Sequence, residues 1–486
     1  MTPAPLLGPK AAILCLILIA FLLRIYNLGF ESLDMDEADG VYLASLPVSD
    51  LLGLLVQVGH SGYLYMLLLK GWIALAGATE FSIRYMALMP GVLVVPIIYR
   101  LGLRLLEPRA ALLAAALATF SSYILHFSQM NRMYTLLLFL GILSSYLLLR
   151  ALDHHRWRWW IAYGFSVMFA VYVHVFAVLL VPWHLCYLLL QFKEHPSNVA
   201  KGLVVLSGIG LPHLPIGLWL LRALEDPRVL NREFTGSEDA LGMLATLARE
   251  YGTRFDLLPQ GLIASFFLGL SVVGIVGLAG SPRGRRAALF LALGVAMPLL
   301  LVYLLTLARI PAFSSRYLIV TLPGFLLLWA GALYFVHSRV SVLGWVLLAA
   351  ILGLNAARWA QTNVYGKHFR EDWRSAAGYL SEQYRQGDLV ILGFSNAKNA
   401  YDYYATEPVA MIGIDQLEGN GGKQALSQEL DRVTKGYENL WLLYSYFQIG
   451  GVESITPWLN EKAKLLDQVH FAGVTVSRFA LMGGDG

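Results

Sequence analysis

The sequence is poor in charge and has almost no cysteine. Only 14% of its 486 residues are charged and 57% are hydrophobic, a composition outside the usual range of soluble globular domains. Its two cysteines, Cys15 and Cys186, lie in apolar runs, and their spacing suits neither a metal site nor a disulfide framework. The net charge of +4 is spread over many short loops, so nucleic-acid binding is not expected. These shortages indicate a polytopic membrane protein.

The N-terminal region lacks the features of a cleaved signal peptide. Lys10 precedes an apolar run of about 20 residues without a convincing small-residue cleavage site, which favours a retained membrane anchor. The chain also shows no internal repeat and no low-complexity segment. Because many transporters are built from paired repeats, this absence counts against a transporter.

Long apolar runs predict about eleven transmembrane helices. The runs lie near residues 11–28, 82–103, 110–127, 133–150, 157–175, 177–192, 202–221, 260–280, 287–307, 317–336 and 340–357. Two further stretches, 39–58 and 62–77, are predicted to form helices in the membrane interface. The expected fold class is therefore an α-helical polytopic membrane protein with interfacial helices.

Basic residues fall in alternate loops between the predicted spans. If residues 62–77 lie at the surface, loops that carry Arg104, Arg150, Arg283 and Arg339 all share one side, and positive charge favours the cytoplasm. The loop 29–81 is then extracytoplasmic. Arg24, within the first span, is expected to snorkel towards the same outer interface.

The composition changes after about residue 358, where charged residues, asparagine and glycine return. Alternating helix-like and strand-like segments predict a small α/β domain, and two final strands are expected to pair as a hairpin. These segments are 372–386, 388–393, 397–404, 408–413, 423–434, 439–444, 465–471 and 474–481. We thus predict a transmembrane module at 1–358 and an extracytoplasmic soluble domain at 359–486, with no glycine-rich phosphate fingerprint in the latter.

Five carboxylates lie within the nine residues from Glu31 to Asp39, directly after the first apolar run. Charge beside a membrane is costly unless it is needed, so this stretch is a candidate reaction centre, with a solvated helix-capping loop as the alternative. Asp36 and Glu37 are adjacent, so their side chains diverge and cannot form the facing acid pair of a glycosidase. A single base that takes a proton from an acceptor hydroxyl while phosphate leaves fits better.

Asp34 and Asp36 also form an Asp-x-Asp pair. Oxygen ligands at this spacing can hold a divalent cation, although two aspartates alone are a weak metal signal. A cation there stays an open alternative, and the sequence identifies no other cofactor.

Basic side chains suited to phosphate are predicted on the same face as the acidic stretch. The planar guanidinium of arginine matches phosphate oxygens, whereas snorkelling at helix ends is the alternative. The candidates are His60, Lys70, Arg84, Arg132 and Arg316. His174, near the outer end of a span, is expected either to orient a substrate or to be a satisfied buried polar group.

Seven short blocks, taken in order, resemble bacterial and archaeal GT-C glycosyltransferases, in the branch of the protein O-mannosyltransferases (glycosyltransferase family 39) and the lipid A aminoarabinose transferases. The blocks are Asp36–Ala38, His60–Tyr65, Glu80–Arg84, Ser128–Tyr134, Tyr172–His174, Arg316–Leu318 and Glu371–Arg374. The resemblance runs from residue 11 to about 395 and is carried by the order and spacing of the blocks. Ser61-Gly62 stands where the family usually has two prolines, and Met130 where it commonly has a glutamate.

The resemblance implies inverting transfer of one sugar from a polyprenyl-phosphate donor to a hydroxyl acceptor on a lipid, glycan or protein. The reaction would take place at the extracytoplasmic face of a bacterial or archaeal plasma membrane. By position, Asp36 would be the base and Glu37 its neighbour, while the basic candidates would lie near the donor phosphate. Further substrate-binding candidates are Asp34, Tyr63, Gln129, Tyr134, His174 and Tyr317.

Two other functions remain in competition at this point. A transporter or flippase of a lipid-linked sugar would use carboxylates as a proton relay, but it normally places them near the bilayer midplane, whereas here they gather on one face. A catalytically silent partner that presents its soluble domain to an assembly is the other, and the intact Asp36-Glu37 pair argues against it.

Overall fold

The structure, a computed structural model, describes residues 8–54, 62–223, 239–253, 258–310, 312–364, 371–407, 409–418 and 422–482. It consists of two units. Unit 1 comprises Met1–Tyr26, Pro47–Leu75 and Ile83–Tyr365, and unit 2 comprises Asn27–Leu46, Ala76–Ser82 and Gly366–Gly486. Two segments from the first hundred residues, the acidic stretch among them, therefore group with the C-terminal region rather than with the helical bundle.

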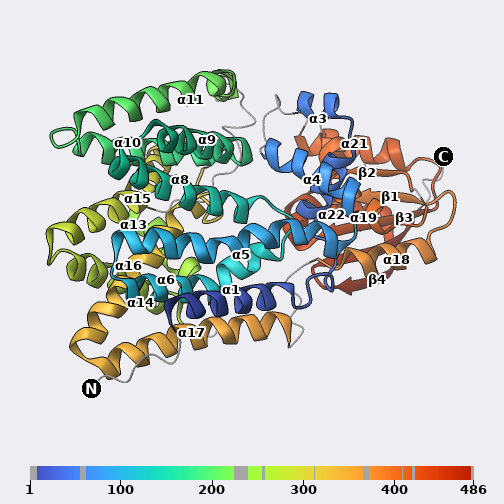
Figure 1. Cartoon of the computed structure of the whole chain (residues 1–486). Coiled ribbons are helices and arrows are strands. Elements are labelled where there is room, and N and C mark those ends of the chain that lie inside the picture. Colours follow the sequence, from blue (N-terminus) through green and yellow to red (C-terminus); the bar gives the residue numbers. More distant parts are fainter. Residues whose placement is uncertain are drawn as a thin grey trace. The chain divides into compact units, whose positions relative to one another are not determined.

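Unit 1 is built from helices (Figure 1). Up to residue 173 they are α1 (Pro9–Ile25), α3 (Val48–Leu54), α4 (Tyr63–Ala76), α5 (Glu80–Leu105), α6 (Pro108–Phe120), α7 (Ser122–Ser128), α8 (Tyr134–His154) and α9 (Trp157–Val173). The later ones are η1 (Val175–Leu179), α10 (Leu180–Leu190), α11 (Pro196–Ala223), α13 (Ala240–Gly252), α14 (Gln260–Leu278), α15 (Pro282–Leu307), η2 (Ile319–Thr321), α16 (Leu322–Arg339) and α17 (Ser341–Asn363).

Six described helices are long and apolar enough to cross a membrane, or seven if the bent pair α6 and α7 forms one span. The sequence predicted about eleven spans because a run of apolar residues can be long enough to span without forming one long unbroken helix. α1 and α9 have only 17 residues each, and the apolar stretch Val175–Leu190 is shorter still.

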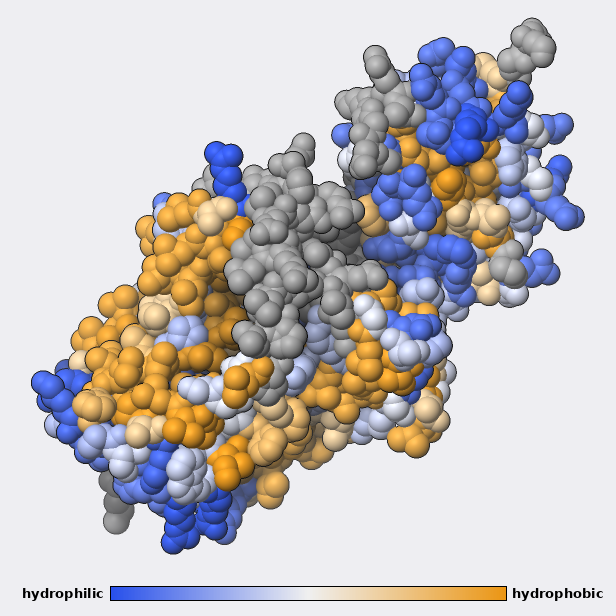
Figure 2. All heavy atoms as spheres, turned by 90° about the horizontal axis from the view of Figure 1, so that it is seen from above, coloured by the Kyte–Doolittle hydropathy of each residue, from blue (hydrophilic) through white to orange (hydrophobic). Residues whose placement is uncertain are grey.

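The outer surface of unit 1 is apolar. Large side chains such as Leu211, Val272 and Trp345 are exposed, and Figure 2 shows broad hydrophobic areas over the helical part of the molecule. A water-soluble protein rarely exposes apolar patches of this extent. Together with the long apolar helices, this surface makes the chain an integral membrane protein.

The break between α6 and α7 has a specific cause. α7 begins at the N-cap Ser121, and the axes of the two helices differ by 52°. The guanidinium of Arg24 donates to the carbonyls of Ala118 and Thr119 at 3.2 Å and to the Ser128 hydroxyl at 3.2 Å. These bonds satisfy carbonyls that the end of α6 leaves without a partner. Arg24 is fully buried, so the prediction that it snorkels to the interface is wrong.

Unit 2 contains a five-stranded sheet in the order β2-β1-β3-β5-β4. Its strands are β1 (Leu389–Leu392), β2 (Met411–Gly413), β3 (Asn439–Ser445), β4 (Ala463–Phe471) and β5 (Val474–Leu481). β1 pairs in parallel with β2 and β3, whereas β5 runs antiparallel to β3 and β4. The predicted α/β character and the predicted C-terminal hairpin are both confirmed.

The helices of unit 2 are α2 (Met35–Ser45), α18 (Trp373–Gln383), α19 (Ala397–Tyr404), α20 (Ile414–Glu418), α21 (Gly422–Thr434) and α22 (Ile449–Lys462), with the short η3 (Tyr446–Gln448). α21 and α22 pack on one face of the sheet through a core that includes Leu426, Leu430, Ile455 and Leu459. α2 packs against α19. The acidic stretch is thereby ordered by residues some 360 positions later in the chain.

Candidate active site

The acidic stretch forms the N-terminus of α2. Asp34 is the N-cap: its Oδ1 accepts from the backbone N–H of Glu37 at 2.8 Å, and Glu37 Oε2 accepts from the backbone N–H of Asp34 at 3.4 Å. This reciprocal pair is a capping box, which the Asp-x-x-Glu spacing favours. Glu37 is fully buried. Two of the predicted site residues, Asp34 and Glu37, therefore start the helix.

Asp36 lies in the first turn of α2, between the two members of the capping box. Its side chain is half-buried and takes no part in the box. The role of Asp36 as a base stays a prediction from the sequence.

Glu371 is a candidate that sequence reasoning placed in a block but gave no role. It is 2% exposed, and its Oε2 accepts from the backbone N–H of Met35 at 3.2 Å and from Trp373 Nε1 at 2.7 Å. Its Oε1 is buried without a well-formed hydrogen bond in the described part of the chain, and the Ser445 hydroxyl lies beside it. Glu371 thus holds the first turn of α2 through a hydrogen bond from the Met35 N–H.

Burial raises the pKa of Glu371, and the negative charge of Asp36 raises it further, against the hydrogen bonds that Glu371 accepts. Glu371 is therefore close enough to Asp36 for the charge of Asp36 to affect its pKa.

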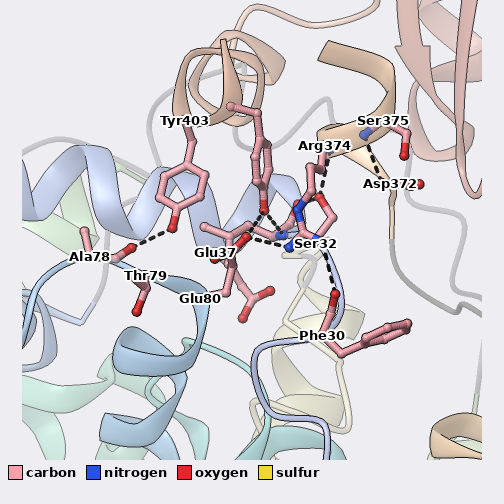
Figure 3. Close-up of polar contacts among 12 residues, drawn as sticks. Phe30, Ser32, Glu37, Ala78, Thr79, Glu80, Asp372, Arg374, Ser375 and Tyr403 are labelled. Atoms are coloured by element: carbon pink, nitrogen blue, oxygen red, sulfur yellow. Dashed lines mark hydrogen bonds and ion pairs between the residues drawn. The ribbon is translucent and has the colours of Figure 1, made fainter. Parts of the chain in front are cut away.

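Arg374 ties the start of the acidic stretch to α18. Figure 3 shows its side chain directed towards Phe30, Ser32 and Glu80. Nη1 donates to the Phe30 carbonyl at 3.2 Å, Nη2 pairs with Glu80 Oε1 at 2.6 Å, and the backbone N–H donates to Ser32 Oγ at 3.1 Å. One residue thereby fixes both N-terminal segments of unit 2.

Helix α19 makes four further bonds to the same segments. Tyr404 OH donates to Glu80 Oε1 at 3.2 Å and accepts from the Leu33 N–H at 2.7 Å. Tyr403 OH donates to the Ala78 carbonyl at 2.6 Å (Figure 3), and Asn399 Nδ2 donates to Asp39 Oδ1 at 2.6 Å. The bonds to Leu33 and Asp39 fix the chain before and after Asp36.

A cavity of about 340 Å³ lies beside this network, within unit 2. Its walls come from the start of the acidic stretch and from the residues that open α18. They are Gly29, Phe30, Glu31, Ser32, Glu371, Asp372, Arg374 and Ser375. The cavity gives a polar group access to the neighbourhood of Glu371.

The Arg374–Glu80 pair leads to a prediction about stability. Glu80 Oε1 accepts from Arg374 Nη2 at 2.6 Å and from Tyr404 OH at 3.2 Å, so one carboxylate joins the segment 76–82 to α18 and α19. Glutamine at this position would remove the ion pair and keep one oxygen acceptor. Because the pair is partly exposed, we expect Glu80→Gln to lower the thermal stability of unit 2 by a small amount.

Circular dichroism melts of the purified protein would measure the change in melting temperature. Glu382→Gln, at an exposed position on α18, is the matched control and should melt like the wild type. Equal melting temperatures of Glu80→Gln and Glu382→Gln would contradict the interpretation.

Unit 1 gathers a second group of predicted residues around His174. The centroid of the His174 ring lies 5.3 Å from that of Tyr317 and 6.0 Å from that of Tyr134. Arg132 and Arg316 are both near enough to interact electrostatically with the His174 side chain. Arg316 Cζ lies 5.3 Å from the Tyr317 ring centroid. Three blocks that are far apart in the sequence therefore meet, with two guanidinium groups suited to bind an anion.

The structure gives a structural reason for His174 as well. Its Nδ1 accepts from the Phe176 N–H at 3.2 Å, at the junction between α9 and η1. The side chain is buried. Both meanings that the sequence allowed, a substrate-orienting residue and a satisfied buried polar group, are compatible with this position.

The remaining predicted residues lie elsewhere or have local roles. Gln129 Nε2 donates to the carbonyls of Arg24 and Tyr26 at 3.1 and 2.9 Å, and so caps the end of α1. Arg84 is buried near the start of α5. Lys70 and Tyr63 are half-buried on α4. His60 lies outside the described residues.

Gly62 explains one departure from the family pattern. Its φ of +96° is a backbone conformation that glycine adopts readily and that a proline, with φ fixed near −65°, cannot adopt. A Cβ here would also lie 3.1 Å from Met133 Cε. The backbone at Gly62 therefore has a conformation that a proline at this position could not have.

The described residues do not fit a metal centre. Among residues 8–54, 62–223 and the other described ranges, no three His, Cys, Asp or Glu side chains converge. Asp34, one of the two predicted ligands, uses its Oδ1 in the capping box. Two carboxylates are fewer oxygen ligands than a hard cation normally takes, and a divalent cation at Asp34 and Asp36 stays a prediction.

Comparison with known proteins identifies the fold. Residues 60–219, about a third of the chain, match the family model described as dolichyl-phosphate-mannose-protein mannosyltransferase. No curated protein sequence matches the chain. Three solved structures show how far the similarity extends.

The apo oligosaccharyltransferase of Archaeoglobus fulgidus has a TM-score of 0.61 at 12% identity, over 98% of this chain and 75% of that one. The archaeal oligosaccharyltransferase AglB from the same organism, in complex with an inhibitory peptide and a dolichol-phosphate, has a TM-score of 0.57 at 10% identity, over 96% and 74%. ArnT from Cupriavidus metallidurans, bound to undecaprenyl phosphate, has a TM-score of 0.57 at 13% identity, over 96% and 97%. The chain has the GT-C fold, and the resemblance found in the sequence is confirmed.

Proposed function

We propose, on the premise of this GT-C fold, that the protein transfers a single sugar from a polyprenyl-phosphate donor to a hydroxyl acceptor. The observation that supports the proposal is the position of Asp36 in the first turn of α2, a turn that Glu371 holds through the Met35 N–H. Solved structures of this fold bind dolichol-phosphate and undecaprenyl phosphate, which supports a lipid-phosphate donor. The family-model match supports the same class of activity.

In the proposed reaction, Asp36 accepts the proton of the acceptor hydroxyl. The hydroxyl oxygen forms a bond to the anomeric carbon on the face opposite the phosphate. The bond between that carbon and the phosphate oxygen breaks, and its electron pair leaves with the polyprenyl phosphate. The result is inversion at the anomeric carbon, and one proton and one sugar have been moved.

Arg132 and Arg316 are proposed to bind the donor phosphate. The leaving phosphate gains negative charge as the bond breaks, and guanidinium groups fixed beforehand stabilise that charge without reorganising. The aromatic rings of Tyr134 and Tyr317, packed about His174, hold this cluster in place. The basic loops favour an orientation in which this cluster is extracytoplasmic.

Glu371 is proposed to be a positioning residue. It accepts the hydrogen bond of the Met35 N–H and thereby fixes the first turn of α2, where the Asp36 side chain begins. Preorganisation of this kind matters because a catalytic group displaced by about 1 Å loses much of its effect. The soluble domain would thus contribute to catalysis without supplying the base.

The proposal is tested with protein purified in detergent. Lipid extracts from cells that lack the protein should contain the unused polyprenyl-phosphate sugar, identifiable by mass spectrometry, and this extract serves as the donor. We expect the purified protein with an extract of cell-envelope acceptors to release polyprenyl phosphate. A flippase has no second compartment in a micelle and a silent partner has no activity, so failure of purified protein to consume the donor would favour either alternative.

A further inference from the structure

A second cavity, of about 370 Å³, lies within unit 1 among helix ends. α5, α8 and α10 end around it, and α15 begins there. It is separate from the group around His174. α8 connects the two: its 21 residues run from Tyr134, beside His174, to His154, next to the cavity-lining Asp153.

A helix of this length spans about 30 Å, which is the thickness of the hydrocarbon core of a bilayer. The cavity therefore lies at the opposite membrane face from the Arg132–Arg316 group, at the depth of lipid head groups. The basic loops predict this face to be cytoplasmic.

The cavity carries an excess of positive charge. Arg104 forms an ion pair with Asp153, and Arg286 Nη2 pairs with Glu194 Oε2 at 2.9 Å. Arg283 Nη2 instead donates to the carbonyls of Leu103 and Arg104, at 3.4 and 3.2 Å, and pairs with no carboxylate in the described part of the chain. These bonds hold a guanidinium at the rim whose charge is not neutralised.

Two buried polar side chains in the wall have no hydrogen bond within the described residues. Tyr187 is 6% exposed and Gln191 is 8% exposed, and both line the cavity. They lie four positions apart at the end of α10, so they share one side of the helix. Their phenol and amide groups are available to bond to whatever fills the cavity.

The start of α15 adds to the attraction for an anion. This helix has 26 residues and begins at the cavity with the N-cap Ser281. The positive dipole end of a long helix favours negative charge. Guanidinium, phenol and amide groups are all donors to phosphate oxygens.

We propose that this cavity binds a phosphate group, of the kind carried by the head group of an anionic membrane lipid. Basic pockets between helices on the cytoplasmic side suit such head groups. The proposal is independent of the transfer reaction, since none of its residues belongs to the candidate active site.

The test uses the full-length protein in nanodiscs of phosphatidylcholine with and without phosphatidylglycerol, and separately in detergent with glycerol 3-phosphate. Native mass spectrometry would count retained phosphatidylglycerol, and the melting temperature would report both ligands. We expect the wild type to retain phosphatidylglycerol in preference to phosphatidylcholine. Arg283→Ala should weaken retention about tenfold, as expected for the loss of a charge-assisted bond to phosphate.

Arg285→Ala is the matched control because it removes the same charge from the same turn, at an exposed position that does not line the cavity. Tyr187→Phe and Gln191→Leu keep the shape of the wall and serve if Arg283→Ala folds poorly. Equal losses in Arg283→Ala and Arg285→Ala, or no preference for phosphatidylglycerol and no stabilisation by glycerol 3-phosphate, would overturn the proposal. Stabilisation by glycerol 3-phosphate alone would assign the site to a free phosphate ester.

Discussion

Replacing Asp36 by Asn is expected to lower the rate of sugar transfer by about 100- to 10,000-fold, the range typical for loss of a general base. Asparagine has the same shape and is accepted near a helix N-terminus, so the capping box of Asp34 and Glu37 should form as in the wild type. The measurement is release of polyprenyl phosphate by purified protein at saturating donor. Because the base acts in the chemical step, kcat should fall and the KM for the donor should change little.

Asp50→Asn is the control for this substitution, since Asp50 is an exposed carboxylate on α3 outside the site. Its activity should match that of the wild type. The pH profile gives a second check: the acidic limb of kcat/KM, which reports the protonation of the base, should disappear with Asp36→Asn. A folded variant that retains full turnover would show that another group takes the proton.

Glu371→Ala is expected to have the second-largest effect. The substitution leaves the buried N–H groups of Met35 and Trp373 without an acceptor, which should cost about 1–3 kcal/mol of stability and loosen the first turn of α2. We expect transfer to fall at least about tenfold through kcat. Hydrogen exchange at the Met35 amide, followed by mass spectrometry, should become faster.

Glu371→Gln separates positioning from acidity. Its amide oxygen can still accept from Met35 and Trp373, so slow exchange at Met35 and most of the transfer activity should return. Glu371 also makes the stability of the protein depend on pH. Because the pKa of Glu371 is raised on folding, its contribution to stability is complete below its usual pKa and declines as the pH rises through the raised value.

Glu371→Gln should therefore abolish that decline in stability, while Glu382→Ala, at an exposed position on α18, should change neither stability nor transfer. If Glu371→Gln is as inactive as Glu371→Ala and yet keeps slow exchange at Met35, the carboxyl group itself takes part in proton transfer. If Glu371→Ala exchanges Met35 at the wild-type rate, the positioning role is wrong.

The sequence predicted the membrane character, the C-terminal α/β domain and the acidic helix start because each depends on residues close together in the chain. The Asp34-x-x-Glu37 spacing is a local capping signal, and the alternative of a helix-capping loop is correct for these two carboxylates. Helix α22 could not be predicted in the same way, since Gly450, Gly451 and Pro457 are poor helix formers and tertiary packing decides the outcome.

Contacts between distant residues could not be read from any local pattern. Glu371 meets Met35 across 336 positions, and Arg374 meets Glu80 across 294. The break after Phe120 contains neither proline nor glycine, and its stabilisation comes from Arg24, which lies 95 positions from Thr119. In each case a polar side chain satisfies backbone groups that only the folded chain brings near.

The grouping of residues 27–46 with the C-terminal domain has a consequence for how this protein can be cut. A chain truncated before Gly366 would keep every membrane helix, yet α2 would lose the template formed by Glu371, Arg374 and Tyr404. The segment that carries the proposed base, Asp36, would then lack the contacts that fix its position. Supplying the missing domain as a separate polypeptide should restore order to α2, so assembly of two fragments, rather than either fragment alone, would define the smallest working unit.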